Sequence, residues 1–265
     1  MTRLTRTPAE LKDVLIDAPR VSLVPTMGAL HSGHISLVRE AKKLGNPLVV
    51  SIFVNPLQFA PGEDLDAYPR TLDEDMAKLE AEGVDAVFAP SVSTMYPHGP
   101  RTTIHPGPLG SVLEGKTRPT HFAGVLTVVA KLFCLTGATD AFFGEKDYQQ
   151  LALIRQMVED LHLPVRVHGC PIIREDSGLA LSSRNRYLSP EEHQAALVLS
   201  RALATGSYEE ARLLLDAAPN VALDYLAVTT PELGELPAGY RGPARLLVAA
   251  KVGETRLIDN AEIEI

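Results

Sequence analysis

Short apolar runs alternate with amphipathic stretches over the first two thirds of the chain. An apolar run at 21–24 predicts a buried strand, and apolar residues then recur at helical spacing over 35–41. The alternation continues with predicted strands at 47–54, 84–89, 140–143 and 165–169, and with predicted helices at 71–82, 124–135 and 148–161. Strands that alternate with helices indicate an α/β fold, in which a Rossmann-like parallel sheet carries helices on both faces.

The pattern changes after residue 173. The segment 174–188 is polar and loop-like, and a capping box at 189–192 starts a new amphipathic helix. A further helix is predicted at 208–217, strands at 224–229 and 245–252, and a hairpin whose turn, 253–254, leads into 255–258. We therefore expect a Rossmann-like domain at 1–173 and a smaller C-terminal α+β domain at 174–265.

Composition and charge narrow the choice of partners. Of the 265 residues, 45% are hydrophobic and 22% are charged, which is typical of a globular protein with a sizeable core. The net charge of −8 argues against nucleic acid or an anionic membrane as a partner. The start of the chain has no apolar leader, and the most apolar run, 123–135, is too short to span a bilayer. Cys134 and Cys170 have no C-x-x-C partner, so we expect two reduced core cysteines in a cytoplasmic protein.

The turn between the first strand and its helix carries the strongest chemical signal. It holds His31 and His34, with Ser32 and Gly33 between them, and it leads directly into the helix N-terminus. Unpaired amides at a helix N-terminus bind anions, and two imidazoles beside them suit a phosphate that gains charge during a reaction. From the pattern alone, two loop histidines that cap a helix are the alternative.

Other polar side chains follow the second and fourth predicted strands. Asn55 and Gln58 come after the second strand, and Lys146 comes after the fourth. Ligands bind outside the carboxyl ends of parallel strands, so we expect these residues to converge with His31. A lysine there neutralises a phosphate, and the amides of Gln58 and Gln150 orient a carboxylate or a hydroxyl. For each residue alone, a solvated surface side chain is the alternative.

Two basic clusters are further candidates. Arg184, beside Ser182 and Ser183, offers planar donors and hydroxyls for a phosphate oxygen, or else forms an ordinary polar turn. Arg118 and His121 precede an apolar helix and are candidates for the same cleft.

The sequence also contains an acidic cluster and lacks several common catalytic and nucleotide-binding motifs. Asp73, Glu74 and Asp75 lie in the first turn of the helix at 71–82, where we expect them to interact with the helix dipole; holding Mg²⁺ through water is the alternative. There is no Ser–His–Asp pattern, no G-x-x-x-x-G-K-[ST] loop and no G-x-G-x-x-G after the first strand. What remains suits attack by a carboxylate on the α-phosphate of a nucleoside triphosphate, since a carboxylate is already a nucleophile at neutral pH.

Six sequence blocks carry a family resemblance. They are PTMGALHSGH at 25–34, FVNPLQF at 53–59, YPRT at 68–71, THFAGV at 120–125, FGEKDYQQ at 143–150 and SSRN at 182–185. In this order they resemble the signature of the pantothenate synthetase (pantoate–β-alanine ligase) family. One block alone would indicate only the wider H-x-G-H nucleotidyl-transfer superfamily.

The resemblance implies a two-step reaction. Pantoate and MgATP give pantoyl adenylate and pyrophosphate, and the amine of β-alanine then displaces AMP to give pantothenate. The family also implies a homodimer. The domain at 1–173 would bind ATP and pantoate, and the domain at 174–265 would close over them.

The resemblance also implies site residues by matching position. The catalytic residues would be His34, His31, Lys146 and Arg184. ATP would be bound by Met27, Gly28, Ala29, Leu30, His31, Ser32, Gly33, His34, Gly144, Glu145, Lys146, Asp147, Ile173, Leu181, Ser182, Ser183 and Arg184. Gln58 would contact pantoate and β-alanine, and Gln150 pantoate, with Asn55, Arg118 and His121 also on the substrate side; no metal ligand is assigned.

The chain departs from the family pattern at Leu181, where a Met is usual. We expect an altered fit near the adenosine rather than lost activity, since both side chains are apolar and similar in volume. The segment at 204–208 is also short for the family. Two other functions stay open: a cytidylyl- or adenylyltransferase that acts on a phosphate or alcohol, and a nucleotide-binding module without catalysis. The neutral amides of Gln58 and Gln150 argue against the first, and the intact basic residues argue against the second.

Overall fold

The computed structural model describes residues 1–60, 62–63 and 65–265, and this part of the chain forms two compact units. The first unit comprises Met1–Glu145 and Leu153–Cys170, and the second comprises Lys146–Ala152 and Pro171–Ile265. The expected boundary at 173/174 lies close to the junction at Cys170. The second unit also takes in the short stretch that contains Lys146.

The first unit contains a parallel sheet of six strands in the order β1-β4-β3-β2-β5-β6 among the described residues. The strands are β1 (Arg3–Thr5), β2 (Ser22–Thr26), β3 (Leu48–Ile52), β4 (Ala86–Phe88), β5 (Asp140–Gly144) and β6 (Arg166–Cys170). Its helices are α1 (Pro8–Leu15), α2 (Ser32–Lys42), α3 (Leu72–Ala81), α4 (Val92–Met95), α5 (Glu114–Thr117), α6 (His121–Thr136) and the part of α7 (Tyr148–Asp160) from residue 153 onward, with 3-10 turns η1 (Pro56–Gln58), η2 (Pro108–Ser111) and η3 (Glu145–Asp147), the last divided between the units.

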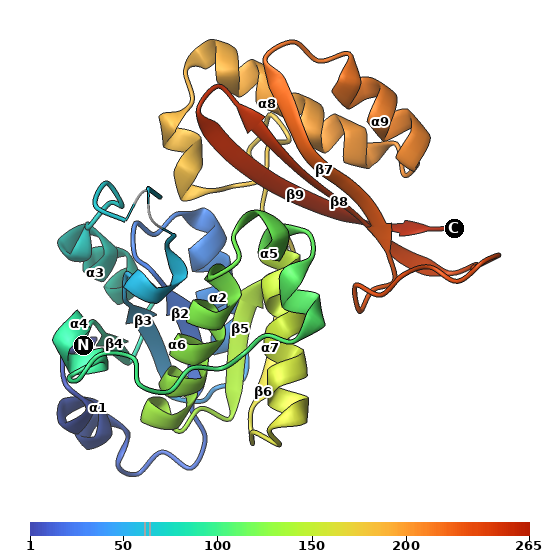
Figure 1. Ribbon diagram of the computed structural model, residues 1–265. Helices are drawn as coiled ribbons and strands as arrows, with labels where there is room; N and C mark the ends of the chain where they lie inside the picture. Colours follow the sequence, from blue (N-terminus) through green and yellow to red (C-terminus); the bar gives the residue numbers. More distant parts are fainter. Residues whose placement is uncertain (61, 64) are drawn as a thin grey trace. The chain divides into compact units, whose positions relative to one another are not determined.

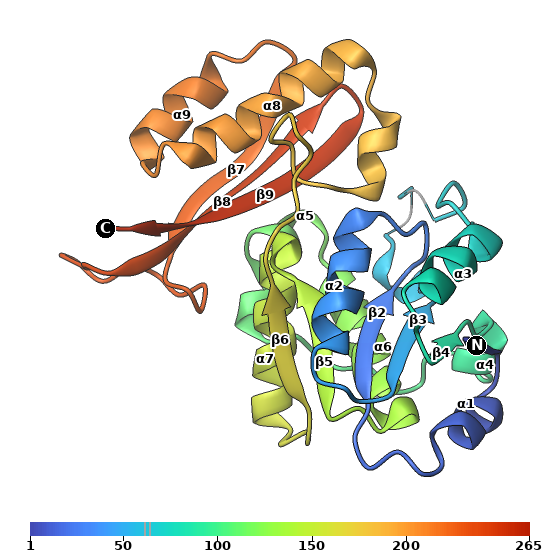
Figure 2. The same ribbon diagram turned by 180° about the vertical axis from the view of Figure 1, so that it is seen from behind.

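Helices cover both faces of this sheet. Figures 1 and 2 show α1 and α6 on one face and α2 and α3 on the other. The α2–α3 face encloses a buried apolar cluster that joins the two helices to five strands: Val24, Leu30, Leu37, Val38, Ala41, Leu48, Val50, Leu79, Val84, Val87, Phe142 and Cys170. The predicted Rossmann-like fold is thereby confirmed.

The central strands β2 and β5 separate towards their carboxyl ends. β2 pairs with β3 along its whole length, but it pairs with β5 only at Ser22 and Leu23. The strand was expected to end before Pro25, yet it continues to Thr26, because Pro25 lies beyond the pairing with β5 and its missing N–H costs no hydrogen bond there. The strand order reverses between β2 and β5, which makes this gap the topological switch point where open α/β sheets bind ligands.

The second unit is the predicted smaller α+β domain. Its antiparallel sheet has the order β7-β8-β9, formed by β7 (Val221–Thr229), β8 (Pro243–Val252) and β9 (Thr255–Glu264). Helices α8 (Pro190–Ala204) and α9 (Tyr208–Asp216) lie on one face of it (Figure 2), and η4 (Ser183–Tyr187) precedes α8. The predicted capping box is present at Ser189 and Glu192, and the predicted hairpin closes where Val252 pairs with Thr255.

Two local expectations were wrong or incomplete. Cys170 is buried, but Cys134 is exposed. The helix that carries Cys134 is apolar on nearly every side, so its sequence does not reveal which stripe faces solvent. Strand β1 was not predicted, because three residues are too few to show a strand period. In the described part of the chain, no helix is long and apolar enough to cross a membrane.

Candidate active site

The histidine turn is a rigid structure at the start of α2. His31 is the N-cap, and its Nδ1 accepts a hydrogen bond from the Gly33 N–H at 3.1 Å. The Nδ1 atom of His34 accepts in turn from the His31 N–H at 3.3 Å. The two imidazole rings lie 4.0 Å apart between centroids. The backbone of the turn therefore fixes both rings.

These contacts also fix which ring nitrogen carries the proton. A ring nitrogen that accepts from a backbone N–H is unprotonated, so a neutral imidazole in this position holds its proton on Nε2. Both His31 and His34 therefore direct an Nε2–H donor away from the backbone. Two such donors beside the amide end of a helix are suited to the oxygens of a phosphate.

The loop before the histidines is anchored to α3. Asp75 was expected to interact with the helix dipole, but its side chain is 0% exposed and accepts the backbone N–H groups of Ala29 and Leu30. Asp73 and Glu74, its neighbours on α3, are exposed. The sequence did contain a sign that Asp75 is buried, because helical spacing places it on the same face of the helix as the apolar Leu79.

Gln58 lies in η1 beyond the end of β3, with its amide held in one orientation. Asn55 Nδ2 donates to Gln58 Oε1 at 3.2 Å and to the Gly124 carbonyl at 3.1 Å. The Tyr96 hydroxyl donates to Asn55 Oδ1 at 3.0 Å. Gln58 Nε2 donates to the Met27 sulfur at 3.0 Å, so the amide of Gln58 reaches the histidine loop. Asn55 is 1% exposed and belongs to this internal network; its predicted contact with substrate stays a prediction.

Arg118 and His121 both bind the backbone of Gln58. The Arg118 guanidinium donates to the Gln58 carbonyl at 3.2 Å, and the His121 ring donates from Nδ1 to the same oxygen at 2.9 Å. Arg118 also forms a two-pronged ion pair with Glu63, with both N–O distances at 2.8 Å. Burial raises the pKa of Glu63, but the hydrogen bond and charge of Arg118 outweigh it, so the pKa lies below its ordinary value. Both predicted residues thus support the Gln58 segment.

The first unit brings together the predicted residues around Gln58 and the histidine turn. Gly144 ends β5, across the gap from β2, and Glu145 follows it. Because β2, β3 and β5 are neighbours in the parallel sheet, the segments that follow them leave from the same edge, while the convergence of their side chains on one ligand stays a prediction.

In the second unit, the backbone of Lys146 is hydrogen-bonded to the antiparallel sheet. Its carbonyl accepts from Asn260 Nδ2 of β9 at 3.1 Å, and its ammonium lies 3.4 Å from the Asp147 carboxylate. Two residues on, the Tyr148 hydroxyl donates to the Pro231 carbonyl at 2.9 Å, and the Arg245 guanidinium stacks on the Tyr148 ring. Gln150, two residues after Tyr148 in α7, is half-buried.

The predicted adenosine residues are joined by the backbone. The Leu181 N–H donates to the Ile173 carbonyl at 2.9 Å, and Ser182 caps η4 by accepting from the Arg184 N–H. Ser183 is the first residue of η4. Ile173 and Leu181 therefore lie side by side at the start of the Ser-Ser-Arg turn.

An ionic network supports this turn. Glu175 accepts from Asn185 Nδ2 at 2.8 Å and lies 2.6 Å from His193 Nε2. Burial raises the pKa of Glu175, but the hydrogen bonds from Asn185 and His193 outweigh it and leave the pKa below its ordinary value. Next to it, Arg174 forms a bidentate pair with Asp259 of β9 at 2.6 and 2.9 Å.

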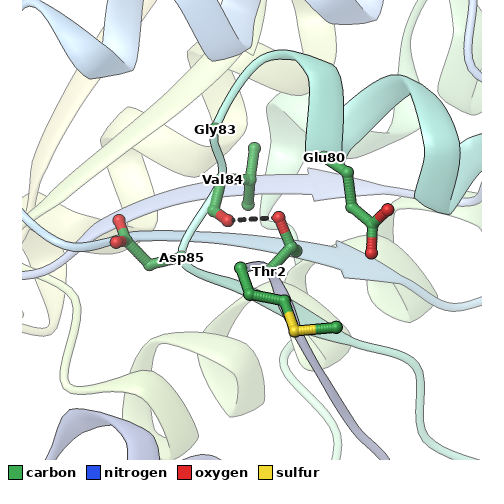
Figure 3. Close-up of a pocket in the computed structure, with 6 residues that line it drawn as sticks. Thr2, Glu80, Gly83, Val84 and Asp85 are labelled. Atoms are coloured by element: carbon green, nitrogen blue, oxygen red, sulfur yellow. Dashed lines mark hydrogen bonds between the residues drawn. The ribbon is translucent and has the colours of Figure 1, made fainter.

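No metal-binding cluster accompanies these groups. Among the residues that the structure describes, no set of three His, Cys, Asp or Glu side chains could hold a metal ion. A separate pocket of about 230 Å³ lies at the amino ends of β1 and β4. Figure 3 shows its lining, which includes the carboxylates of Glu80 and Asp85 and the bond from the Thr2 hydroxyl to the Val84 carbonyl. Its acidic lining is unsuited to a phosphate, and it contains none of the predicted site residues.

A model of the pantoate-beta-alanine ligase family matches residues 3–262. The chain belongs to this family. The resemblance seen in the sequence blocks is thereby confirmed. The matched range includes the histidine turn, the Gln58 network and the Ser-Ser-Arg turn.

Individual relatives agree with the family match. The pantothenate synthetase of Corynebacterium jeikeium is 62% identical over 256 residues, which cover 92% of this chain and 83% of that protein. A crystal structure of pantothenate synthetase from Thermus thermophilus superposes with a TM-score of 0.91 at 48% identity and covers 98% of both chains. The pantoate-beta-alanine ligase of Francisella tularensis, crystallised with beta-gamma ATP and beta-alanine, gives a TM-score of 0.84 at 34% identity and covers 98% of this chain and 97% of that one.

Proposed function

We propose that this chain catalyses the ATP-dependent condensation of (R)-pantoate with β-alanine, which gives pantothenate, AMP and pyrophosphate through a pantoyl adenylate. The observation that carries the proposal is the family match over residues 3–262, since this range contains every residue of the predicted site. The relative from Francisella tularensis, crystallised with ATP and β-alanine, supports both substrates.

In the first step, a pantoate carboxylate oxygen attacks the α-phosphorus of ATP. The new O–P bond forms as the bond to the β-phosphate oxygen breaks, and pyrophosphate leaves. Negative charge grows on the phosphate oxygens, so the Nε2–H donors of His31 and His34 bind the transition state more strongly than the ground state. The cations of Lys146 and Arg184 neutralise the triphosphate and the departing pyrophosphate.

In the second step, the amine of β-alanine attacks the acyl carbon of pantoyl adenylate. The C–N bond forms, the bond between the acyl carbon and the phosphate oxygen breaks so that AMP leaves, and the proton lost by the amine nitrogen passes to solvent. Asn55 donates to the Oε1 atom of Gln58, and one Nε2–H of Gln58 donates to the Met27 sulfur. The second Nε2–H donor suits a carboxylate of pantoate or β-alanine. Gln150 is proposed to contact pantoate.

The proposal requires that residues of both units contact one ATP molecule. The first unit would supply Met27 to His34, and the second would supply Lys146 and Arg184, with Ile173 and Leu181 against the adenine. We propose that Mg²⁺ enters with ATP as part of the substrate, bound by its phosphates. A homodimer and a cytoplasmic location are proposed from the family resemblance, and light scattering of the purified protein tests the dimer.

A reconstituted assay tests the function. The purified chain is mixed with MgATP, pantoate and β-alanine, each substrate is omitted in turn, and AMP and pantothenate are measured. We expect pantothenate only in the complete mixture, and exchange of labelled pyrophosphate into ATP when pantoate is present without β-alanine. Exchange without pantoate, or activity towards a phosphorylated acceptor, would instead favour a nucleotidyltransferase.

Matched variants connect the activity to the site. His34→Ala is compared with His98→Ala, since His98 is an exposed histidine outside the proposed site. Loss of pantothenate synthesis in the first variant alone supports the assignment, whereas equal activity in the two variants removes His34 from the mechanism.

A further inference from the structure

Asp75 is a buried carboxylate with two backbone partners from a distant part of the chain. It lies in the first turn of α3 and is 0% exposed. Its Oδ2 atom accepts the Ala29 N–H at 2.9 Å, and its Oδ1 atom accepts the Leu30 N–H at 2.8 Å. The Thr71 hydroxyl donates a third bond to Oδ2 at 3.1 Å. Charged hydrogen bonds of this kind are stronger than neutral ones.

The loop held by Asp75 has an unusual backbone. Gly28 has φ of 84° and Ala29 has φ of 52°, so two consecutive residues adopt the left-handed region. This region is unfavourable for alanine, and such a conformation persists only when surrounding contacts impose it. Close approach also matters, since a Cβ atom on Gly28 would lie 3.2 Å from Asp75 Oδ2.

A second residue of α3 completes the contact. The Lys78 ammonium donates to the Leu30 carbonyl at 2.7 Å, and it lies 4.0 Å from Asp75 Oδ1. Helix α3 therefore binds both polar groups of the Leu30 backbone and the N–H of Ala29. The helix itself is anchored by Leu79, which is fully buried in the apolar cluster beneath α2 and α3.

We propose that Asp75, assisted by Lys78, is a positioning residue for adenylation, because it holds the loop from Gly28 to Leu30 in the conformation that aims His31 and His34 at the triphosphate. This inference rests on the proposed function. It assigns a role to one member of the acidic cluster at 73–75. The Asp75 carboxylate is buried and both of its oxygens accept from the backbone, which argues against a direct role as a magnesium ligand.

The position of the carboxylate also directs the phosphates. Backbone N–H groups of a strand-to-helix loop are natural phosphate ligands. Asp75 occupies those of Ala29 and Leu30, which leaves the triphosphate to the imidazoles and to the amide end of α2. Loss of the carboxylate would release the left-handed turn and expose two competing donors, so ATP would bind in a less reactive position.

The decisive variant is Asp75→Asn, which keeps the shape but replaces one acceptor by a donor that faces a backbone N–H. We expect kcat/KM for ATP to fall about tenfold or more, while KM for pantoate stays within about twofold. The amide proton resonances of Ala29 and Leu30 should move upfield. Glu74→Gln is the matched control, because Glu74 is the preceding residue and is exposed; it should change neither quantity.

A second variant keeps the test decisive if Asp75→Asn does not fold. Lys78→Met removes the bond to the Leu30 carbonyl from a side chain that is 44% exposed, so the fold should be retained. We expect a several-fold rise in KM for ATP and a shift of the Leu30 amide resonance. Lys43→Met, at the exposed C-cap of α2, should have neither effect.

Three results would overturn the inference. One is unchanged amide resonances of Ala29 and Leu30 in Asp75→Asn. Another is an equal loss of kcat/KM in Asp75→Asn and Glu74→Gln. The third is a tenfold increase in the Mg²⁺ concentration required by Asp75→Asn with the loop resonances unmoved, which would make Asp75 a metal ligand. The resonances report on the loop without any reaction. They therefore still show whether Asp75 holds the loop from Gly28 to Leu30 if the wild-type chain makes no pantothenate.

Discussion

Removal of one hydroxyl group, in Tyr96→Phe, tests the network that orients Gln58. The Tyr96 hydroxyl donates to Asn55 Oδ1 at 3.0 Å, and Asn55 Nδ2 in turn donates to Gln58 Oε1 at 3.2 Å. Tyr96 is 9% exposed, so phenylalanine fills the same buried space. The substitution therefore deletes one hydrogen bond without creating a large cavity.

The expected loss of stability is small. A buried neutral hydrogen bond contributes about 1 kcal/mol to the free energy of unfolding. Asn55 Oδ1 keeps a second donor, the Leu57 N–H at 3.3 Å, so the oxygen is not left unsatisfied. We expect Tyr96→Phe to be about 1 kcal/mol less stable than wild type in urea unfolding.

The effect on activity should be selective. The Gly124 carbonyl still holds Asn55 Nδ2, so the orientation of Asn55 is loosened rather than lost. A loss of about 0.5–1 kcal/mol in positioning corresponds to a fall of roughly two- to fivefold in kcat/KM for pantoate and β-alanine. KM for ATP should not change, because Gln58 is not proposed to contact the phosphates.

Alkaline pH provides an independent readout. Burial raises the pKa of Tyr96 from 10.0 to about 12. The neutral phenol is therefore favoured in the folded state, and its contribution to stability is complete below pH 10 and is lost as the pH rises to about 12. A shift of two pKa units corresponds to roughly 2–3 kcal/mol of unfolding free energy, which wild type should lose between about pH 10 and 12. Tyr96→Phe should lack this part of the loss.

Tyr187→Phe is the control, since Tyr187 is 43% exposed. It should leave stability and kinetics at neutral pH unchanged. The reasoning about Gln58 is refuted if Tyr96→Phe is destabilised as expected but keeps wild-type kcat/KM for both pantoate and β-alanine.

Three further variants test the site. His34→Ala should lower kcat by roughly 100- to 1000-fold with a much smaller change in KM for ATP, because its donor acts on charge that develops in the transition state. Lys146→Ala should cost about 3 kcal/mol or more in kcat/KM for ATP, as measured by steady-state kinetics. Gly124→Ala should raise KM for pantoate and lower the free energy of unfolding by at least about 1–3 kcal/mol, because its Cβ would lie 2.2 Å from the Leu57 carbonyl oxygen, next to Gln58.

Each of these outcomes has a clear opposite. An unchanged kcat in His34→Ala removes the residue from the mechanism. Wild-type kinetics in Lys146→Ala, compared with Lys43→Ala as a surface control, would count against a phosphate contact. Gly124→Ala with wild-type stability would mean that the η1 segment moves aside freely, contrary to the hydrogen bonds that Gln58 makes with Asn55, Arg118 and His121.

The sequence by itself determined the order of strands and helices, the histidine turn and the terminal hairpin. These features are local: a strand or helix shows its period within about ten residues, and a cap or turn shows its chemistry within four. The same locality explains the omission of β1 and the wrong expectation for Cys134. A strand of three residues has too few positions to show a period, and an all-apolar helix does not mark its exposed side.

Only the tertiary structure decided how the site is held. Asp75 is 46 residues from Ala29, Tyr96 is 41 residues from Asn55, and Asn260 is 114 residues from Lys146. A hydrogen bond between such positions depends on the path of the chain between them, which no local period encodes. The sequence therefore identified the groups that are proposed to act on a triphosphate, whereas their buried polar partners emerged only when the packed sheet and helices brought distant residues together.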